Sequence, residues 1–287
     1  MTSTTKSSLL SLTMMLRTLK LPTMHDEAEH AAERAIREGW SFTDFLHYLC
    51  ELELNERGRR RVERNLRASN LPAEKTDATL QRKKLPLHVA RMLSTLFEGE
   101  WVKRGENLLI FGLPGRGKTH LACAIGHELV RRGHRVLFTA TYSLVQRLLQ
   151  SKRDLRLQKE LDALDSYELV ILDDIGYVQQ SREEMEVLFT FLAERYEHRS
   201  VAITSNLVFS EWGKIFKDEM TTAAAIDRVV HHSIILEMNN KSVRAEQAEE
   251  ALRETTTTPA TTTSETTTTS ANRSEPAINR DPQVGEM

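Results

Sequence analysis

The segment that most constrains the fold of this chain is Gly-Leu-Pro-Gly-Arg-Gly-Lys-Thr at residues 112–119. It matches the pattern G-x-x-x-x-G-K-[ST] at every fixed position, follows the apolar run 108–111 and opens a helical pattern. The helix points the positive end of its dipole at the place where the N–H groups of the loop converge. The segment therefore predicts a phosphate-binding loop between a strand and a helix.

The sequence around this loop alternates short apolar runs with longer amphipathic stretches, from about residue 85 to residue 253. One helix is expected over 119–132, ended by Gly133, and another begins at the capping box Ser181-Arg-Glu-Glu184. The strand candidates are continuous apolar runs, as in a parallel sheet covered on both faces, at 107–111, 135–139, 168–173, 201–204 and 233–238. This alternation predicts an α/β fold.

The residues of the loop have distinct expected roles in a nucleotide site. Its glycines let the backbone curl around a phosphate, Lys118 neutralises the outer phosphates, and the Thr119 hydroxyl is a hard oxygen suited to Mg²⁺. We predict ATP and Mg²⁺ as cofactors. The predicted nucleotide-binding residues are Gly112, Leu113, Pro114, Gly115, Arg116, Gly117, Lys118, Thr119 and His120.

An acid pair forms the second half of the predicted site. Four apolar residues, 169–172, end in Asp173 and Asp174, which places two carboxylates at the edge of the sheet beside the phosphate loop. We expect Asp173 to hold Mg²⁺ through water, as a second metal-binding residue with Thr119. Asp174 occupies the position of a base that activates the attacking water.

Two further residues follow the next strand. Asn206 ends the segment Val-Ala-Ile-Thr-Ser-Asn, where it either orients the attacking water or is a polar strand end entering a loop. Arg228 either completes the ATP site of a neighbouring subunit or forms a surface ion pair. With Asp174 they make up the predicted catalytic set.

Basic residues are concentrated in two places, although the net charge of the whole chain is −2. Ten Lys or Arg and four Asp or Glu lie between residues 55 and 84, a local charge of +6 that is an electrostatic footprint for phosphate. A solvated helix face is the alternative at both places. The predicted DNA-binding residues are Arg57, Arg59, Arg60, Arg61 and Arg64, with a second group of Lys152, Arg153 and Arg156.

Composition divides the chain into five parts. We expect a flexible lead at 1–22, a helical basic N-terminal domain at 23–70, a linker at 71–84 and an ATPase domain at 85–253. The tail, 254–287, is predicted to be disordered, because eleven of the fifteen residues 255–269 are threonine and bury no apolar area. Cys50 and Cys123 lack metal-site spacing, and no apolar run is long enough for a membrane span, so we expect a cytoplasmic protein without membrane contact.

With these motifs in place, the chain resembles the IstB family, the ATPase helpers of transposition in bacterial insertion sequences. The resemblance covers about residues 30 to 250. It rests on Arg-Glu-Gly-Trp-Ser at 37–41, Leu-Pro-Ala-Glu-Lys-Thr at 71–76, Gly-Lys-Thr-His-Leu-Ala at 117–122, Asp-Ile-Gly-Tyr at 174–177, Ser-Arg-Glu-Glu at 181–184, Thr-Ser-Asn at 204–206, Glu-Trp-Gly at 211–213 and Asp-Arg-Val-Val-His-His at 227–232.

The resemblance implies an AAA+ fold of the clade that includes the helicase loader DnaC and the initiator DnaA. It also implies self-assembly through the ATP sites on double-stranded DNA and an IstA-type partner transposase. It favours the role of Arg228 in a neighbouring site and a DNA-facing helix after the second strand. The chain departs from the family where Asp174 replaces the usual glutamate and where 240–244 reads Asn-Lys-Ser-Val-Arg.

Two other functions remain open at this point. A helicase loader of the DnaC type would grip a replicative helicase through apolar contacts of its N-terminal helix, whereas the helix here is rich in arginine. An ATP-gated DNA-binding scaffold with little turnover is the second alternative, against which Asp174 and Asn206 argue. The favoured function is an ATP-dependent DNA-binding helper that recruits or regulates a transposase.

Overall fold

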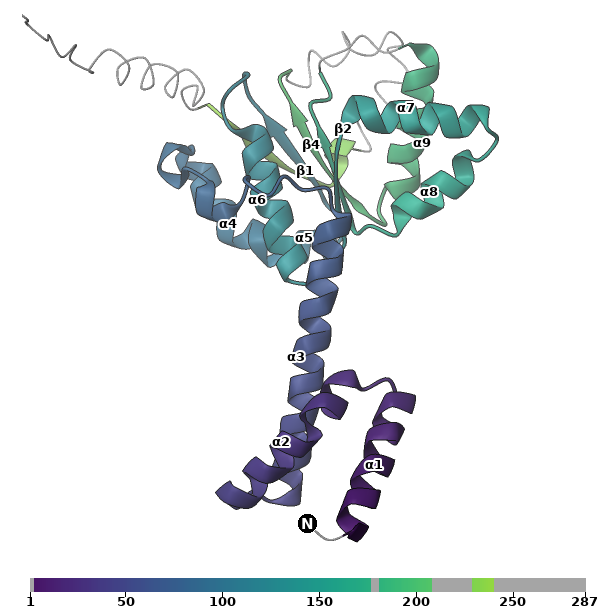
Figure 1. Ribbon diagram of the computed structural model, residues 1–287. Helices are drawn as coiled ribbons and strands as arrows, with labels where there is room; N and C mark the ends of the chain where they lie inside the picture. The colour runs from purple at the N-terminus through teal and green to yellow at the C-terminus, as the bar shows by residue number, and fades with distance from the viewer. Residues whose placement is uncertain (1–2, 177–180, 208–228, 240–287) are drawn as a thin grey trace, which may run out of the picture. The chain divides into compact units, whose positions relative to one another are not determined.

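The computed structural model describes residues 3–176, 181–207 and 229–239 (Figure 1). All of them lie within one compact unit, Met1–Glu246. The predicted tail 254–287, the motif residues 211–213 and Arg228 lie outside the described residues.

Five parallel strands form the sheet that carries the fold. They are β1 (Asn107–Phe111), β2 (Val136–Ala140), β3 (Leu169–Asp173), β4 (Ser200–Ser205) and β5 (Ser233–Glu237), in the spatial order β2-β3-β4-β1-β5. Each matches a strand expected from the sequence to within one residue at either end. The predicted α/β class with a parallel sheet is confirmed.

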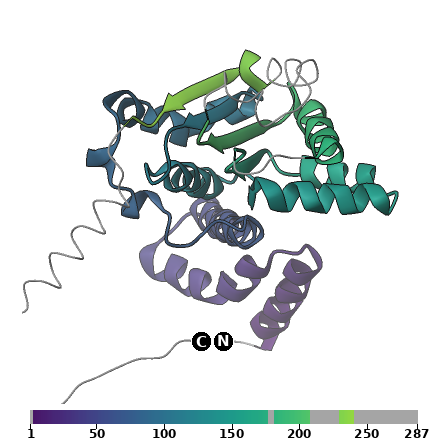
Figure 2. The ribbon, with the colours of Figure 1, turned by 90° about the horizontal axis from the view of Figure 1, so that it is seen from above.

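Helices cover both faces of this sheet (Figures 1 and 2). One face packs on α4 (Leu87–Glu98), α5 (Glu100–Lys103) and α6 (Lys118–Arg131), and the other on α7 (Thr141–Arg153), α8 (Leu157–Asp165) and α9 (Arg182–Arg195). Alternate strand residues divide between the two cores: Leu108 and Ile110 face α6, whereas Leu109 and Phe111 face the α7–α9 layer. This two-sided burial explains why the strand sequences are continuously apolar.

Three helices precede the sheet: α1 (Ser3–Thr18), α2 (Pro22–Glu38) and α3 (Phe42–Ala68). Gly39, with φ +67°, ends α2, and a reciprocal capping box between Ser41 and Asp44 starts α3. Within the segment expected as a flexible lead, 1–22, residues 3–18 are helical and Leu16 packs against the small core that contains Met24, Ala31 and Leu49. Leucine and methionine are good helix formers, and this core gives the helix something to pack on.

The end of α3 is fastened to the sheet domain by side-chain and backbone hydrogen bonds. The Asn65 amide donates to the carbonyls of Gly133 at 3.2 Å and His134 at 3.3 Å, in the turn that follows α6. The Phe138 N–H on the edge strand β2 donates to the Ser69 carbonyl at 2.7 Å. The last turn of α3 is therefore held against both α6 and the sheet edge.

The segment 71–84, expected as a linker, runs along α6 with two short 3-10 turns, Asp77–Thr79 and Arg82–Lys84. Its Leu80 is buried in the core on the α6 side of the sheet, and the Pro72 carbonyl lies 3.0 Å from His127 Nε2. A Cβ on Gly126 would meet the side chains of Ile171 at 2.9 Å and Leu71 at 3.0 Å, which explains a glycine inside α6. Among the described residues, no helix is long and apolar enough to cross a membrane.

Arg195, at the end of α9, is a buried cation that holds backbone rather than a carboxylate. Only 2% of it is exposed, and its guanidinium donates to the carbonyls of Leu164, Tyr167 and Ser200 at 2.9–3.0 Å, with a longer bond to Glu168. Burial lowers the pKa of Arg195 to about 9, so it remains charged at neutral pH. One side chain thus connects the end of α8 with the starts of β3 and β4.

Arg195→Met should therefore destabilise the fold by about 3 kcal/mol or more, because several buried carbonyls lose their donor at once. Thermal unfolding followed by circular dichroism should show a midpoint lower by roughly 6–12 °C. Arg199→Met is the matched control, since Arg199 is 38% exposed beside Asp165 and should cost less than about 1 kcal/mol. Equal shifts in the two variants would contradict the role assigned to Arg195.

Candidate functional site

The predicted phosphate loop connects the end of β1 to the start of α6, as its sequence requires. Three of its glycines adopt positive φ angles: +153° at Gly112, +79° at Gly115 and +87° at Gly117. A Cβ on Gly112 would lie 2.7 Å from the Met238 carbonyl oxygen. The chain therefore needs a glycine at the residue that follows β1. Because α6 begins at Lys118, its first N–H groups and the loop lie at one end of the helix dipole.

The Lys118 ammonium is positioned by three oxygen atoms at the top of this loop. It donates to the carbonyls of Gly112 at 2.7 Å and Leu113 at 3.1 Å, and to Asn206 Oδ1 at 2.7 Å. Only 7% of Lys118 is exposed. The cation is therefore confined between the loop and the end of β4.

Asp173 accepts two hydroxyl hydrogen bonds at the carboxyl end of β3. Thr119 Oγ1 donates to Asp173 Oδ1 at 2.8 Å, and Thr204 Oγ1 donates to the same oxygen at 2.7 Å. The Thr119 hydroxyl and the Asp173 carboxylate thus offer hard oxygens side by side. Such a pair fits Mg²⁺, which takes one or two protein oxygens and completes its shell with phosphate and water.

Asp174 has a left-handed backbone, with φ +63°, that directs it away from the line of β3. Its N–H donates to Thr204 Oγ1 at 2.9 Å, and its carboxylate accepts from Asn206 Nδ2 at 3.1 Å. Aspartate is among the few residues other than glycine that enter this conformation readily. Asn206 therefore bridges the Lys118 ammonium and the Asp174 carboxylate with the two ends of its amide.

The geometry brings together five of the predicted residues, Lys118, Thr119, Asp173, Asp174 and Asn206, and adds one that sequence reasoning missed. Thr204 is 1% exposed and holds both aspartates, through the carboxylate of one and the N–H of the other. The sequence signal that could have identified Thr204 is a hydroxyl residue at the end of a predicted strand, two positions before Asn206. Arg228 lies outside the described residues, and the roles of all these residues remain predictions.

His120, the last residue of the predicted nucleotide-binding set, contacts the 71–84 segment. Its Nε2 lies 3.1 Å from the Thr76 carbonyl oxygen and 3.1 Å from Thr79 Oγ1. The first turn of α6 is thereby joined to the segment that follows α3.

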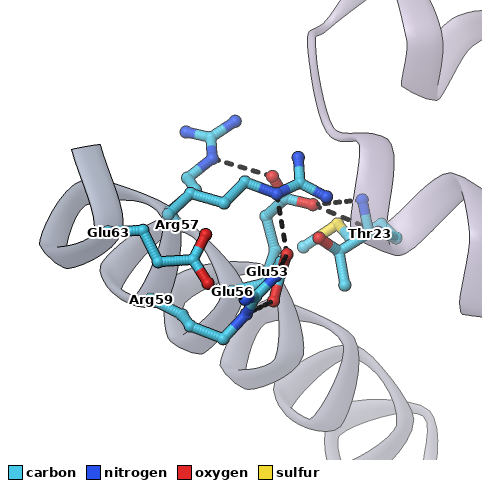
Figure 3. A network of polar contacts seen from close by, with 8 residues as sticks. Thr23, Glu53, Glu56, Arg57, Arg59 and Glu63 are labelled. Carbon is cyan, nitrogen blue, oxygen red and sulfur yellow. Dashed lines mark hydrogen bonds and ion pairs between the residues drawn. The ribbon is translucent and has the colours of Figure 1, made fainter. Parts of the chain in front are cut away.

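The arginines predicted to bind DNA fall into two groups on α3, and the first is paired within the protein (Figure 3). Arg57 donates to Glu53, whose carboxylate also accepts the N–H groups of Thr23 and Met24 at the start of α2. Although burial raises the pKa of Glu53, these hydrogen bonds leave it below its usual value.

Arg59 pairs with Glu56 and Glu63, and Arg60 pairs with Glu56. Hydrogen bonds from the two arginines lower the pKa of Glu56 to about 2. Arg57, Arg59 and Arg60 are therefore paired with acidic residues three or four positions away on the same helix.

The second group, Arg61, Arg64 and Arg67, is exposed and has no ion pair with any residue that the structure describes. Arg61 lies against Gly133, beside the turn after α6. Arg64 and Arg67 are one helical turn apart and flank Asn65, which anchors α3. Arg67 was not among the predicted contacts, yet it is exposed, like Arg64.

The second basic cluster lies around the turn between α7 and α8. Lys152 Nζ is 2.8 Å from Glu186, Arg153 is 4.0 Å from Glu183, and Arg156 is 2.8 Å from Asp154. All three cations are at least 39% exposed, and exposed pairs of this kind contribute little. Their charge remains available to a polyanion.

Comparison with known proteins gives consistent matches. The family model of IstB-like ATP binding proteins matches residues 14–251. An insertion sequence ATP-binding protein of Sinorhizobium fredii is 44% identical over 241 residues, covering 84% of this chain and 81% of the relative. The insertion sequence IS21 ATP-binding protein of Pseudomonas aeruginosa is 36% identical over 244 residues, covering 84% and 91% of the two chains.

Among solved structures, the replication initiator DnaA bound to AMPPCP and single-stranded DNA aligns with a TM-score of 0.51 at 17% identity. The alignment covers 67% of this chain and 59% of that chain. At this identity the likeness supports the AAA+ fold alone.

Proposed function

This chain belongs to the family of IstB-like ATP binding proteins of IS21-type insertion sequences, and from that premise we propose that it is a Mg²⁺-dependent ATPase that self-assembles on duplex DNA and recruits or regulates a partner transposase of the IstA type. The observation that carries the proposal is the Asn206 bridge between Lys118 and Asp174. It supports the proposal because one amide contacts both the ammonium that we assign to the phosphates and the carboxylate that we assign to the attacking water. The membership agrees with the family resemblance drawn from the motifs.

In this proposal the residues of the site divide the work of hydrolysis. Bound ATP supplies the phosphoanhydride that is cleaved. Lys118 neutralises charge on the outer phosphates, while Thr119 and Asp173 hold Mg²⁺. Asp174 takes the proton of the attacking water, and Asn206 orients that water from the neighbouring strand.

Self-assembly through the ATP sites gives Arg228 its proposed role. An arginine supplied by a neighbouring subunit stabilises the charge that develops on the transferred phosphoryl group. ATP binding and assembly would then depend on one another. We propose that the assembled form, rather than the single subunit, hydrolyses ATP.

For DNA contact, the pairing pattern on α3 narrows the proposed set. Arg59 and Arg60 already share Glu56, whereas Arg64 and Arg67 lack an acidic partner in the part of the chain that the structure describes. An arginine without a partner gains most from a phosphate, because no existing ion pair must be broken. We therefore assign the main backbone contact on α3 to Arg64 and Arg67, with Arg61 beside them.

Replacing Arg64 and Arg67 by glutamine should weaken duplex binding about equally on every sequence and lower the log–log salt slope by about two units. The matched control is Arg59→Gln with Arg60→Gln, which removes the same charge from the same helix but should change the slope by less than about one unit. Fluorescence anisotropy of a labelled duplex across a salt series measures both. If the two double variants behave alike, the proposed division of α3 is wrong.

A further inference from the structure

The turn between α7 and α8 contains a leucine where the backbone favours glycine. After α7 ends, Leu155 N–H donates to the Lys152 carbonyl at 3.0 Å and Arg156 N–H donates to the Ser151 carbonyl at 2.8 Å. This pair of bonds is the usual C-terminal helix motif that requires one left-handed residue. Leu155 is that residue, with φ +55°.

Neither stability nor solubility accounts for a leucine at this position. Its side chain is 94% exposed, so it contributes no core packing to offset the strained backbone. Glycine or asparagine would relieve that strain and remove an apolar group from water. Strained residues that persist without a packing benefit are found mostly at functional sites.

The residues around Leu155 indicate which kind of ligand its side chain contacts. Between Lys152 and Lys159 there are four basic residues and one acid, Asp154, a local charge of +3. Two acids of α9, Glu183 and Glu186, approach Arg153 and Lys152 in exposed pairs. Figure 1 shows the α7–α8 turn at the outer end of its two helices, directed away from the sheet. An exposed apolar side chain with four basic residues close to it in the sequence matches the apolar interior and anionic edges of a nucleic-acid duplex.

We propose that Leu155 is a wedge that enters the base stack of duplex DNA and partly unstacks one step, while the surrounding cations hold the phosphates on either side. Leucine is one of the side chains that proteins insert between base pairs to kink a duplex. The inference rests on the proposed DNA binding and adds deformation of the DNA to it. A duplex bent in this way would present a distorted target to a partner enzyme.

The test uses the full-length protein and a duplex that carries 2-aminopurine, whose fluorescence rises when its neighbours unstack. We compare the parent with Leu155→Gly and Leu155→Asn, which suit the left-handed backbone and should fold at least as well as the parent. Leu155→Met is the matched variant that keeps an apolar wedge. Anisotropy of a second, labelled duplex gives affinity and salt slope in parallel.

The parent and the methionine variant should raise 2-aminopurine fluorescence several-fold at one or a few positions. The glycine and asparagine variants should lose that rise, with an unchanged salt slope and an affinity reduced by less than about tenfold. If the parent binds the duplex without any rise, or if glycine leaves the rise intact, the wedge is overturned while DNA binding stands. A parent that does not bind duplex at all overturns the proposed function, and the wedge with it.

Discussion

Replacement of Lys118 by alanine is expected to weaken ATP binding by about 100-fold or more. The ammonium is held among two loop carbonyls and Asn206, and it is the cation that we propose binds the outer phosphates. Losing two charge-assisted hydrogen bonds removes roughly 3 kcal/mol or more, which is about two orders of magnitude in affinity. Isothermal titration with ATP and Mg²⁺ measures this directly.

Lys103→Ala is the control for this experiment, because Lys103 is an exposed lysine paired with Glu100 close to the start of β1. It should bind ATP as the parent does. Thermal unfolding of both variants separates loss of the ligand contact from loss of the fold. Micromolar ATP binding retained by Lys118→Ala would show that the loop does not use this lysine.

The second large effect is expected at Asp174. Asp174→Asn should lower the rate of ATP hydrolysis by about 100-fold to 10,000-fold, the range in which a general base contributes. Asparagine accepts the left-handed backbone as readily as aspartate, and its N–H can still donate to Thr204. The proposed Mg²⁺ ligands Thr119 and Asp173 are untouched, so binding of ATP and of duplex DNA should be unchanged.

Phosphate release under single-turnover conditions distinguishes this outcome from a binding defect. Asp162→Asn, an exposed aspartate of α8, provides a control of equal charge change. Hydrolysis at the parental rate in Asp174→Asn would mean that another group activates the water. A parallel loss of ATP affinity would instead assign Asp174 to nucleotide or metal binding.

The strands and the phosphate loop were predictable because their signals are local. A run of four or five apolar residues bounded by polar ones is typical of a buried strand. The loop motif requires a strand before it and a helix after it. The helix over residues 3–18 was not predictable, for the opposite reason. Their sequence is rich in serine, threonine and leucine and has no strong hydrophobic periodicity. The helix instead packs on a small core that contains Met24 of α2 and Leu49 of α3.

The site shows a similar division between local and distant information. Asp173, Asp174 and Asn206 were identifiable as strand ends, but their mutual contacts depend on β4 lying between β3 and β1, which no single segment encodes. The pairing on α3 was readable, because Glu56 and Arg60 are four residues apart, as are Arg59 and Glu63. The net charge of the segment 55–84 does not reveal these ion pairs.

The position of α6 connects the proposed ATP site with the end of α3 that we propose contacts DNA. Its first residue is Lys118. About 21 Å away, the turn that follows its last residue accepts hydrogen bonds from the amide of Asn65, which lies between Arg64 and Arg67 on α3. If ATP binding tilts the first turn of α6 and DNA binding shifts its last turn, the two sites are coupled. ATP must then change the affinity for DNA by the same factor by which DNA changes the affinity for ATP. The protein would then report its nucleotide state to DNA through a single helix, without any change in its surface charge.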